Sequence, residues 1–248
     1  MGIIAVWGKG GSGVSTTAAN IAVTLSKNNL VGLIGSRKDY GSIHHYFGME
    51  LQEQKSLKNA IESQDREDVV KNFMQYPPRK DLFVLGMADT EGIKNISEDS
   101  AVHLLKVCSE AFDYVVIDCT PYFSDALTAI GCIKAEKIIQ VIRPTIQDIA
   151  YVQAQEKFIE MLEIKSKIIP VCNINKNYMP LNLIEKKLEL KFFEVLSANK
   201  EVEKSGITGV PVCMENSFLT MDYRKGIRNI CNRIEISNTI TVRRTAKA

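Results

Sequence analysis

The chain has 248 residues, of which 45% are hydrophobic and 24% charged, and its formal net charge is +2. This length fits one large α/β domain or two small ones, and the composition is that of a globular protein with a sizeable core. The small net charge excludes a strong global attraction to nucleic acid, although local basic patches remain open. No apolar stretch approaches the roughly 18 residues that span a membrane, and the first apolar run is too short for a secretory leader, so we expect a cytoplasmic protein.

Short apolar runs recur along the chain, and helical spacing lies between or after them. Runs that are apolar on both faces suit strands buried between two helix layers. Strands of this kind are predicted at residues 3–7, 30–34, 82–85, 114–117, 137–142 and 167–172, and helices at 16–28, 98–111, 147–163 and 217–234. This alternation predicts an α/β fold with a doubly wound, mostly parallel sheet, whose ligands bind beyond the carboxyl ends of the strands.

The chain has no internal repeat and no low-complexity linker that would separate a second domain. Residues 50–80 are polar and charged and end at Pro77-Pro78, so we interpret them as an excursion that carries one or two helices. We expect one domain over residues 1–235 and a loose basic tail at 236–248. Near the end of the domain, one helical stripe is formed by Tyr223, Ile227, Ile230, Cys231 and Ile234. The stripe lacks Phe, Trp and Leu, which favours packing on the sheet over a membrane-surface helix.

Cysteine and histidine give no paired metal-binding pattern. No two of the six cysteines are spaced as C-x-x-C, and several lie in apolar runs, which predicts buried free thiols in a reducing compartment. His44 and His45 are adjacent, but no second cluster in the sequence completes a metal site. We interpret these two histidines as surface or loop residues.

The stretch GKGGSGVSTT (residues 8–17) follows the first predicted strand and opens a helix. Its glycines and Ser15 fit the phosphate-loop pattern G-x-x-x-x-G-K-[ST], but Val14 stands at the lysine position. Backbone amides in such a loop point at phosphate oxygens, and the helix dipole favours the same negative charge. The hydroxyl of Ser15 is placed to ligand Mg²⁺. Because strand, loop and helix occur together, we favour nucleotide binding over a purely structural glycine turn.

The segment from Lys9 to Ser15 resembles the deviant Walker A loop of the ParA/MinD P-loop ATPases, K-G-G-x-G-K-[ST], at every position except Val14. The resemblance extends to about residue 215 and implies a P-loop NTPase fold that binds ATP and Mg²⁺. It also implies a homodimer bridged by nucleotide, in which Lys9 acts catalytically on the partner's nucleotide. The residues that it assigns to cofactor binding in the loop are Gly10, Gly11, Ser12, Gly13, Val14, Ser15 and Thr16.

Two later segments extend the resemblance. FDYVVIDCTPYFSD (112–125) looks like the second acidic motif, in which Asp118 joins Ser15 at the metal. IIPVCNINKN (168–177) looks like the strand whose terminal Asn173 contacts the adenine, although a polar strand-end cap remains the alternative. VLSANKEVEKSGITGVPV (195–212) resembles the late loop and helix that close over the base.

The second predicted strand departs from the family pattern. The family has Asp-x-Asp before a Gly-Ser pair, but LIGSRKDYGSI (33–43) places Gly35 and Arg37 there. Without these carboxylates the attacking water should be poorly positioned, so we expect weak ATP hydrolysis at most. Because one positive charge is lost at Val14 and one is gained at Arg37, we hypothesise that Arg37, or failing that Lys38, reaches the phosphates. The alternative is that both are solvated surface charges.

The resemblance implies a protein that positions or partitions a cargo. The degenerate loop and lost aspartates lean toward the pilus-positioning, CpaE/TadZ-like branch, with plasmid or chromosome partition as the competitor. The implied partner is a protein of a pilus, secretion or partition system, with a DNA or membrane surface left open and recruitment to a pole, membrane or nucleoid. The other reading is a pseudoenzyme that serves as an interaction scaffold and binds no nucleotide.

Overall fold

The computed structural model describes residues 2–51, 54–89, 92–174, 179–197 and 199–245, with side chains to residue 236. In this part of the chain, eight strands form one sheet in the order β3-β4-β2-β5-β1-β6-β7-β8. Neighbouring strands are parallel, except that β3 runs antiparallel to β4. The strands are β1 (Gly2–Gly8), β2 (Val31–Gly35), β3 (Met74–Gln75), β4 (Leu82–Leu85), β5 (Tyr114–Asp118), β6 (Lys137–Ile142), β7 (Ile168–Ile174) and β8 (Glu194–Ser197).

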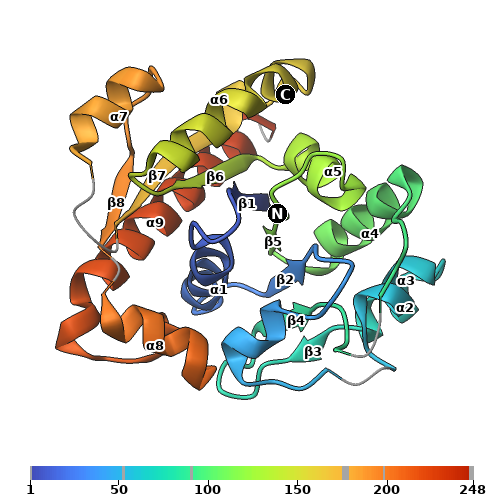
Figure 1. Ribbon diagram of the computed structural model, residues 1–248. Coiled ribbons are helices and arrows are strands. Elements are labelled where there is room, and N and C mark those ends of the chain that lie inside the picture. Colours follow the sequence, from blue (N-terminus) through green and yellow to red (C-terminus); the bar gives the residue numbers. More distant parts are fainter. Residues whose placement is uncertain (1, 52–53, 90–91, 175–178, 198, 246–248) are drawn as a thin grey trace.

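Helices cover both faces of this sheet, as the sequence predicted (Figure 1). One layer contains α1 and α9, together with the 3₁₀ turn η1 (Ile43–Phe47), and the other contains α4, α5 and α6. The helices are α1 (Val14–Leu25), α2 (Leu57–Glu62), α3 (Arg66–Lys71), α4 (Glu98–Ala111), α5 (Ala126–Lys134), α6 (Ile146–Met161), α7 (Leu181–Lys187), α8 (Lys200–Thr208) and α9 (Met221–Thr245). The doubly wound α/β fold is therefore confirmed.

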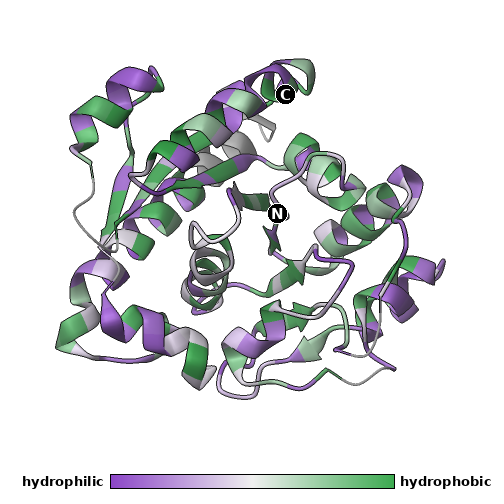
Figure 2. Cartoon of the chain, viewed as in Figure 1, coloured by the Kyte–Doolittle hydropathy of each residue, from purple (hydrophilic) through white to green (hydrophobic). Residues whose placement is uncertain are grey.

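Strand β1 shows why its sequence is apolar without alternation. Ile4 and Val6 face the core under α1 and α9, whereas Ala5 and Trp7 face the core under α4 and α5, and all four are fully buried. Both faces of the strand therefore lie in apolar surroundings, which is typical of a parallel sheet between two helix layers. Figure 2 shows the same arrangement, with hydrophobic colouring on the central strands and polar colouring on the outer sides of the helices.

The edges of the sheet were not predicted. Strand β3 has two residues, and β8 contains Glu194 and Ser197 in a short segment with no continuous apolar run. Both are edge strands, which need no apolar residues on two faces. The excursion at residues 50–80 carries two short helices, α2 and α3, as expected.

Helix α9 is longer than the sequence analysis anticipated. Its backbone is helical to Thr245, so the expected loose tail from residue 236 is wrong over residues 236–245. These residues include neither proline nor glycine, so nothing in the sequence ends the helix at 235. The predicted apolar stripe is buried against α1 and β8, with Ile227 and Ile230 fully buried. No helix in the described ranges has the length and apolar character needed to cross a membrane.

Candidate functional site

The loop at residues 8–13 leaves the carboxyl end of β1 and leads directly into α1. Gly13 caps the helix with φ of 98°, a left-handed conformation that favours glycine. No side chain caps the first turn of α1, so its amides remain available to an anion. The loop therefore has the backbone arrangement of a phosphate cradle.

A cavity of about 250 Å³ lies over this loop. Its lining includes the predicted residues Lys9, Gly10, Gly11, Gly13, Val14, Ser15, Thr16 and Arg37. Gly8, Tyr46, Cys119 and Pro121 complete it. The end of β1, the loop after β2 and the loop after β5 thus meet at one point, as the topology rule for parallel sheets requires.

Ser15 and Asp118 form a pair beside the cavity. The Ser15 hydroxyl hydrogen-bonds to the carboxylate of Asp118, whose side chain is buried at the end of β5. Burial raises the pKa of Asp118 to about 6, although the Ser15 hydrogen bond and the charge of Arg37 act in the opposite direction. Its Oδ2 is buried and has no hydrogen-bond partner among the described residues. The Ser15 hydroxyl and the Asp118 carboxylate thus offer two oxygen ligands, and Oδ2 of Asp118 has no other partner among the described residues. Such a pair fits a Mg²⁺ ion that keeps several waters and contacts phosphate.

Arg37 and Lys38 have different surroundings. Arg37 lines the cavity, donates a hydrogen bond to the Tyr40 hydroxyl, and lies with its guanidinium carbon 5.3 Å from the Tyr40 ring centroid. Lys38 is instead paired with Asp125, with Nζ 3.5 Å from Oδ1, and does not line the cavity. Of the two cations after β2, Arg37 is the one beside the phosphate loop.

Two residues that we predicted to bind the cofactor, Ser12 and Asn173, form hydrogen bonds with the backbone of the phosphate loop. We expected Ser12 among the cofactor-binding residues, but its side chain is fully buried and its Oγ donates to the Lys9 carbonyl at 2.7 Å. Its backbone amide donates to the same carbonyl at 3.0 Å, so both of its donors are used inside the turn. Asn173, at the end of β7, donates from Nδ2 to the Ser12 carbonyl at 2.8 Å. Its Oδ1 is buried and has no partner among the described residues.

Gly35, which stands where the family pattern has the first aspartate of Asp-x-Asp, lies next to Asp118. Gly35 is paired with Asp118 in the register between β2 and β5. A Cβ on Gly35 would stand 2.7 Å from Cγ2 of Ile43, so the packing of η1 leaves no space for a side chain there. The described site therefore has one carboxylate where the family pattern would place several.

Sequence reasoning missed Tyr46 and Cys119 as lining residues. Cys119 directly follows Asp118 and could have been found from that adjacency. Tyr46 reaches the cavity only because η1 folds back toward the loop, and no local pattern indicates this. Arg143, in the loop after β6, also lies near the phosphate loop: it pairs with Asp148 at 3.5 Å, and its Nη2 would be 3.9 Å from a Cβ on Gly11.

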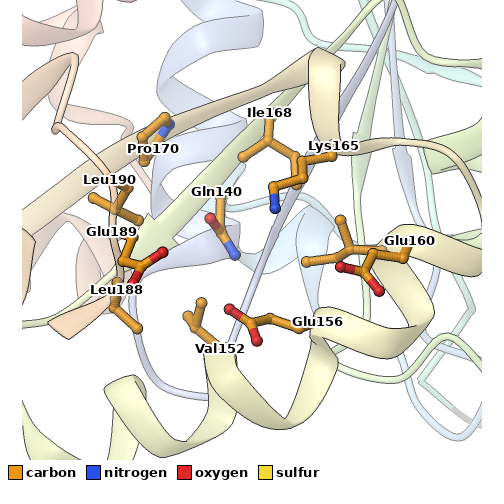
Figure 3. A pocket seen from close by; sticks show the side chains of 11 residues that line it. Gln140, Val152, Glu156, Glu160, Lys165, Ile168, Pro170, Leu188, Glu189 and Leu190 are labelled. Atoms are coloured by element: carbon orange, nitrogen blue, oxygen red, sulfur yellow. The ribbon is translucent and has the colours of Figure 1, made fainter.

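A second cavity, of about 260 Å³, lies between α6 and β7 and includes no residue of the phosphate loop (Figure 3). Its charged lining consists of Glu156, Glu160, Glu189 and Lys165 around the buried amide of Gln140. Three carboxylates against one ammonium would repel a triphosphate. The glycine-loop cavity is therefore the better nucleotide site.

Comparisons with known proteins agree with this fold. A ParA family model, described as NUBPL iron-transfer P-loop NTPase, matches residues 2–215. The septum site-determining protein MinD of Bacillus subtilis (strain 168) is 25% identical over 249 residues, which cover 94% of this chain and 88% of that protein. The MinC:MinD cell division protein complex of Aquifex aeolicus contains a similar chain, with a TM-score of 0.78, 17% identity and coverage of 94% and 95%. MinD of Pyrococcus horikoshii OT3, complexed with Mg-ADP, gives a TM-score of 0.77, 16% identity and coverage of 97% and 98%.

Proposed function

The chain belongs to the ParA family of P-loop NTPases, and from that premise we propose that it is an ATP-binding switch, dimerising around nucleotide, that positions or partitions a cargo. The observation that carries the proposal is the cavity lined by the uncapped start of α1, by Ser15 and by Arg37, with Asp118 hydrogen-bonded to Ser15 beside it. These groups supply the amides, metal ligands and positive charge that a magnesium triphosphate needs.

Each residue has a proposed role in binding. The amides of Gly10, Gly11 and Gly13 and of the first α1 residues hold the phosphates, and Ser15 with Asp118 holds Mg²⁺. Arg37 replaces the ammonium that Val14 lacks, because it is the cation after β2 that lines the cavity. Asn173 accepts a hydrogen bond from the adenine at its unpartnered Oδ1. The Mg-ADP bound to the Pyrococcus relative supports this choice of cofactor.

Hydrolysis is proposed to be slow or absent. Bound Mg²⁺ would neutralise charge on the phosphates, but the water that attacks them needs a positioning group. Gly35 has no side chain to offer, and Arg37 at the second aspartate position cannot accept a proton from water. Lys9 lines the cavity, with Nζ 3.4 Å from the Gly10 carbonyl, and is proposed to act across the dimer on the partner's nucleotide.

The cargo is proposed to be a pilus or secretion assembly, with plasmid or chromosome partition as the competing assignment. The lost aspartates and the altered loop lysine favour the first, and the septum-positioning relative from Bacillus supports a positioning task in general. By analogy with the MinC:MinD complex, the switch would recruit a protein partner. Iron transfer, named in the family description, is not proposed, since the six cysteines lack C-x-x-C spacing and five of them are buried.

Equilibrium binding of Mg·ATP, combined with sedimentation, tests this proposal. Binding with ATP-linked dimer formation and little phosphate release is the expected result. The Lys9→Ala variant should keep ATP binding but lose dimer formation, while Ser15→Ala should lose the dependence of binding on Mg²⁺. Absence of binding at millimolar ATP would contradict the proposal and favour the pseudoenzyme scaffold. Fast phosphate release that Ser15→Ala abolishes would contradict the slow switch and indicate a working ATPase.

A further inference from the structure

Two side chains of η1 meet a third side chain from the segment after β4. His44 and His45 belong to η1, and Asp89 follows β4. The Nε2 atoms of both histidines lie 3.1 Å from the same oxygen, Oδ1 of Asp89, and the two imidazole rings are 4.1 Å apart between centroids. One donor atom from each of the three residues lies within 4.8 Å of the other two. The sequence analysis found no third ligand because Asp89 is more than forty residues away in the chain.

These separations match those around a small metal ion. With bond lengths of about 2.0–2.2 Å, two ligand atoms on a tetrahedral zinc ion lie about 3.4 Å apart. The two N···O separations of 3.1 Å are close to this value, so small side-chain movements would admit an ion. The His44 side chain is fully buried, whereas those of His45 and Asp89 are 55% and 53% exposed. An ion could therefore enter from solvent, and water could complete its coordination.

The cluster requires a residue without a side chain at position 41, which is Gly41. A Cβ on Gly41 would stand 2.4 Å from Cε1 of His44 and 2.9 Å from Oδ1 of Asp89, so a side chain at position 41 would displace both. We interpreted the two histidines as surface or loop residues, which is wrong for His44 because it is buried against β4.

We propose that His44, His45 and Asp89 bind a divalent transition-metal ion of the zinc class, at a site separate from the Mg²⁺ position at Ser15 and Asp118. Two imidazoles and one carboxylate suit Zn²⁺, Co²⁺ or Ni²⁺ better than Mg²⁺, which prefers oxygen ligands. The buried Nδ1 of His44 has no hydrogen-bond acceptor among the described residues, which weakens affinity by roughly 10–100-fold relative to a fully supported ligand. Because Tyr46 follows His45 and lines the nucleotide cavity, a bound ion would brace η1 beside that cavity.

Titration of the metal-free 248-residue chain with Co²⁺ and Zn²⁺, without nucleotide, tests this site. We expect one ion per chain by calorimetry and a cobalt spectrum typical of nitrogen and oxygen ligands. His45→Ala and Asp89→Asn alter exposed side chains and should each weaken binding by more than about tenfold. His103→Ala, which removes the third histidine of the chain, should bind as the unaltered protein does.

Thermal unfolding of each variant shows whether it is folded before binding is compared. The site is overturned if the unaltered chain binds no ion. It is also overturned if His45→Ala and His103→Ala bind equally well, or if thiolate-to-cobalt absorption identifies cysteines as the ligands. None of these results depends on ATP binding, so they leave the nucleotide proposal to its own test.

Discussion

The side-chain amide of Asn173 lies so close to Gly13 that a Cβ on Gly13 would stand 2.2 Å from Asn173 Nδ2. The same nitrogen donates to the Ser12 carbonyl, so the end of β7 is fastened to the phosphate loop. Two segments 160 residues apart in sequence therefore fix one turn. The precision of the loop depends on this contact as well as on its own glycines.

Gly13→Ala should abolish nucleotide binding and lower the melting temperature. The variant places a side chain both on a φ of 98° and against Asn173, and a strained backbone of this kind costs on the order of 1–3 kcal/mol before the clash is counted. Gly10→Ala is the matched control, because a Cβ there meets nothing nearer than 4.0 Å. Calorimetric ATP binding and thermal melts compare the two variants, and equal losses would contradict the argument.

Asn173→Ala separates the two roles of this side chain. Loss of the bond to Ser12 should lower the free energy of unfolding by about 1 kcal/mol. If Oδ1 also accepts a hydrogen bond from the adenine, the variant should lose most of its preference for ATP over GTP. Competition of the two nucleotides against a fluorescent analogue measures the preference. An unchanged ATP-to-GTP ratio, with both affinities reduced, would limit Asn173 to supporting the loop.

Arg37→Ala should weaken ATP binding by about ten- to a hundredfold. A charge-assisted hydrogen bond contributes roughly 1.5–3 kcal/mol, and about 1.4 kcal/mol corresponds to a factor of ten in the dissociation constant. Lys38→Ala removes the neighbouring charge, which is paired with Asp125, and should change the affinity little. Introducing Val14→Lys into the Arg37→Ala chain should restore part of the loss. Equal, small effects of the two alanine variants would refute the replacement of the loop lysine by Arg37.

The central strands of the sheet could be predicted from the sequence, whereas its edge strands could not. Strand β1 is buried on both faces, so its apolar run and the glycine loop after it predicted both the sheet and the phosphate cradle. Strand β8 is a four-residue edge strand, and nothing in its composition demands two buried faces.

The site residues divide in the same way. Ser15 could be predicted because it begins α1 directly after the glycine loop, and Asp118 because it ends the apolar strand β5. The inward orientation of Ser12 could not, since its position in the pattern is the same whether its hydroxyl faces the cavity or the Lys9 carbonyl. The cluster of His44, His45 and Asp89 depends on the packing of η1 against β4, a contact between segments that no local pattern reports.

Asp118→Asn should stabilise the protein when metal and nucleotide are absent. Burial raises the pKa of Asp118 from 3.8 to about 6, so the folded state holds this proton more tightly than the unfolded state. That contribution is fully present below pH 3.8 and is lost as the pH rises through 6, which corresponds to roughly 3 kcal/mol. Urea unfolding in EDTA should therefore show the asparagine variant gaining stability relative to the unaltered chain as the pH rises from about 3.8 through about 6, with little further change above that. A constant difference across this range would contradict the assignment of a buried, unsatisfied carboxylate.

Ile230→Ala should lower the free energy of unfolding by about 2–5 kcal/mol, because this fully buried side chain packs between α9, α1 and the sheet. Ile236→Ala lies further along the same helix, where the side chain is 56% exposed, and should cost less than about 0.5 kcal/mol. Denaturant unfolding at one pH compares the two substitutions. If α9 were instead a helix held loosely for membrane binding, both substitutions would cost little and vesicle binding would fall equally in the two variants. A large loss confined to Ile230→Ala would establish α9 as part of the core that supports α1 and, through it, the phosphate loop.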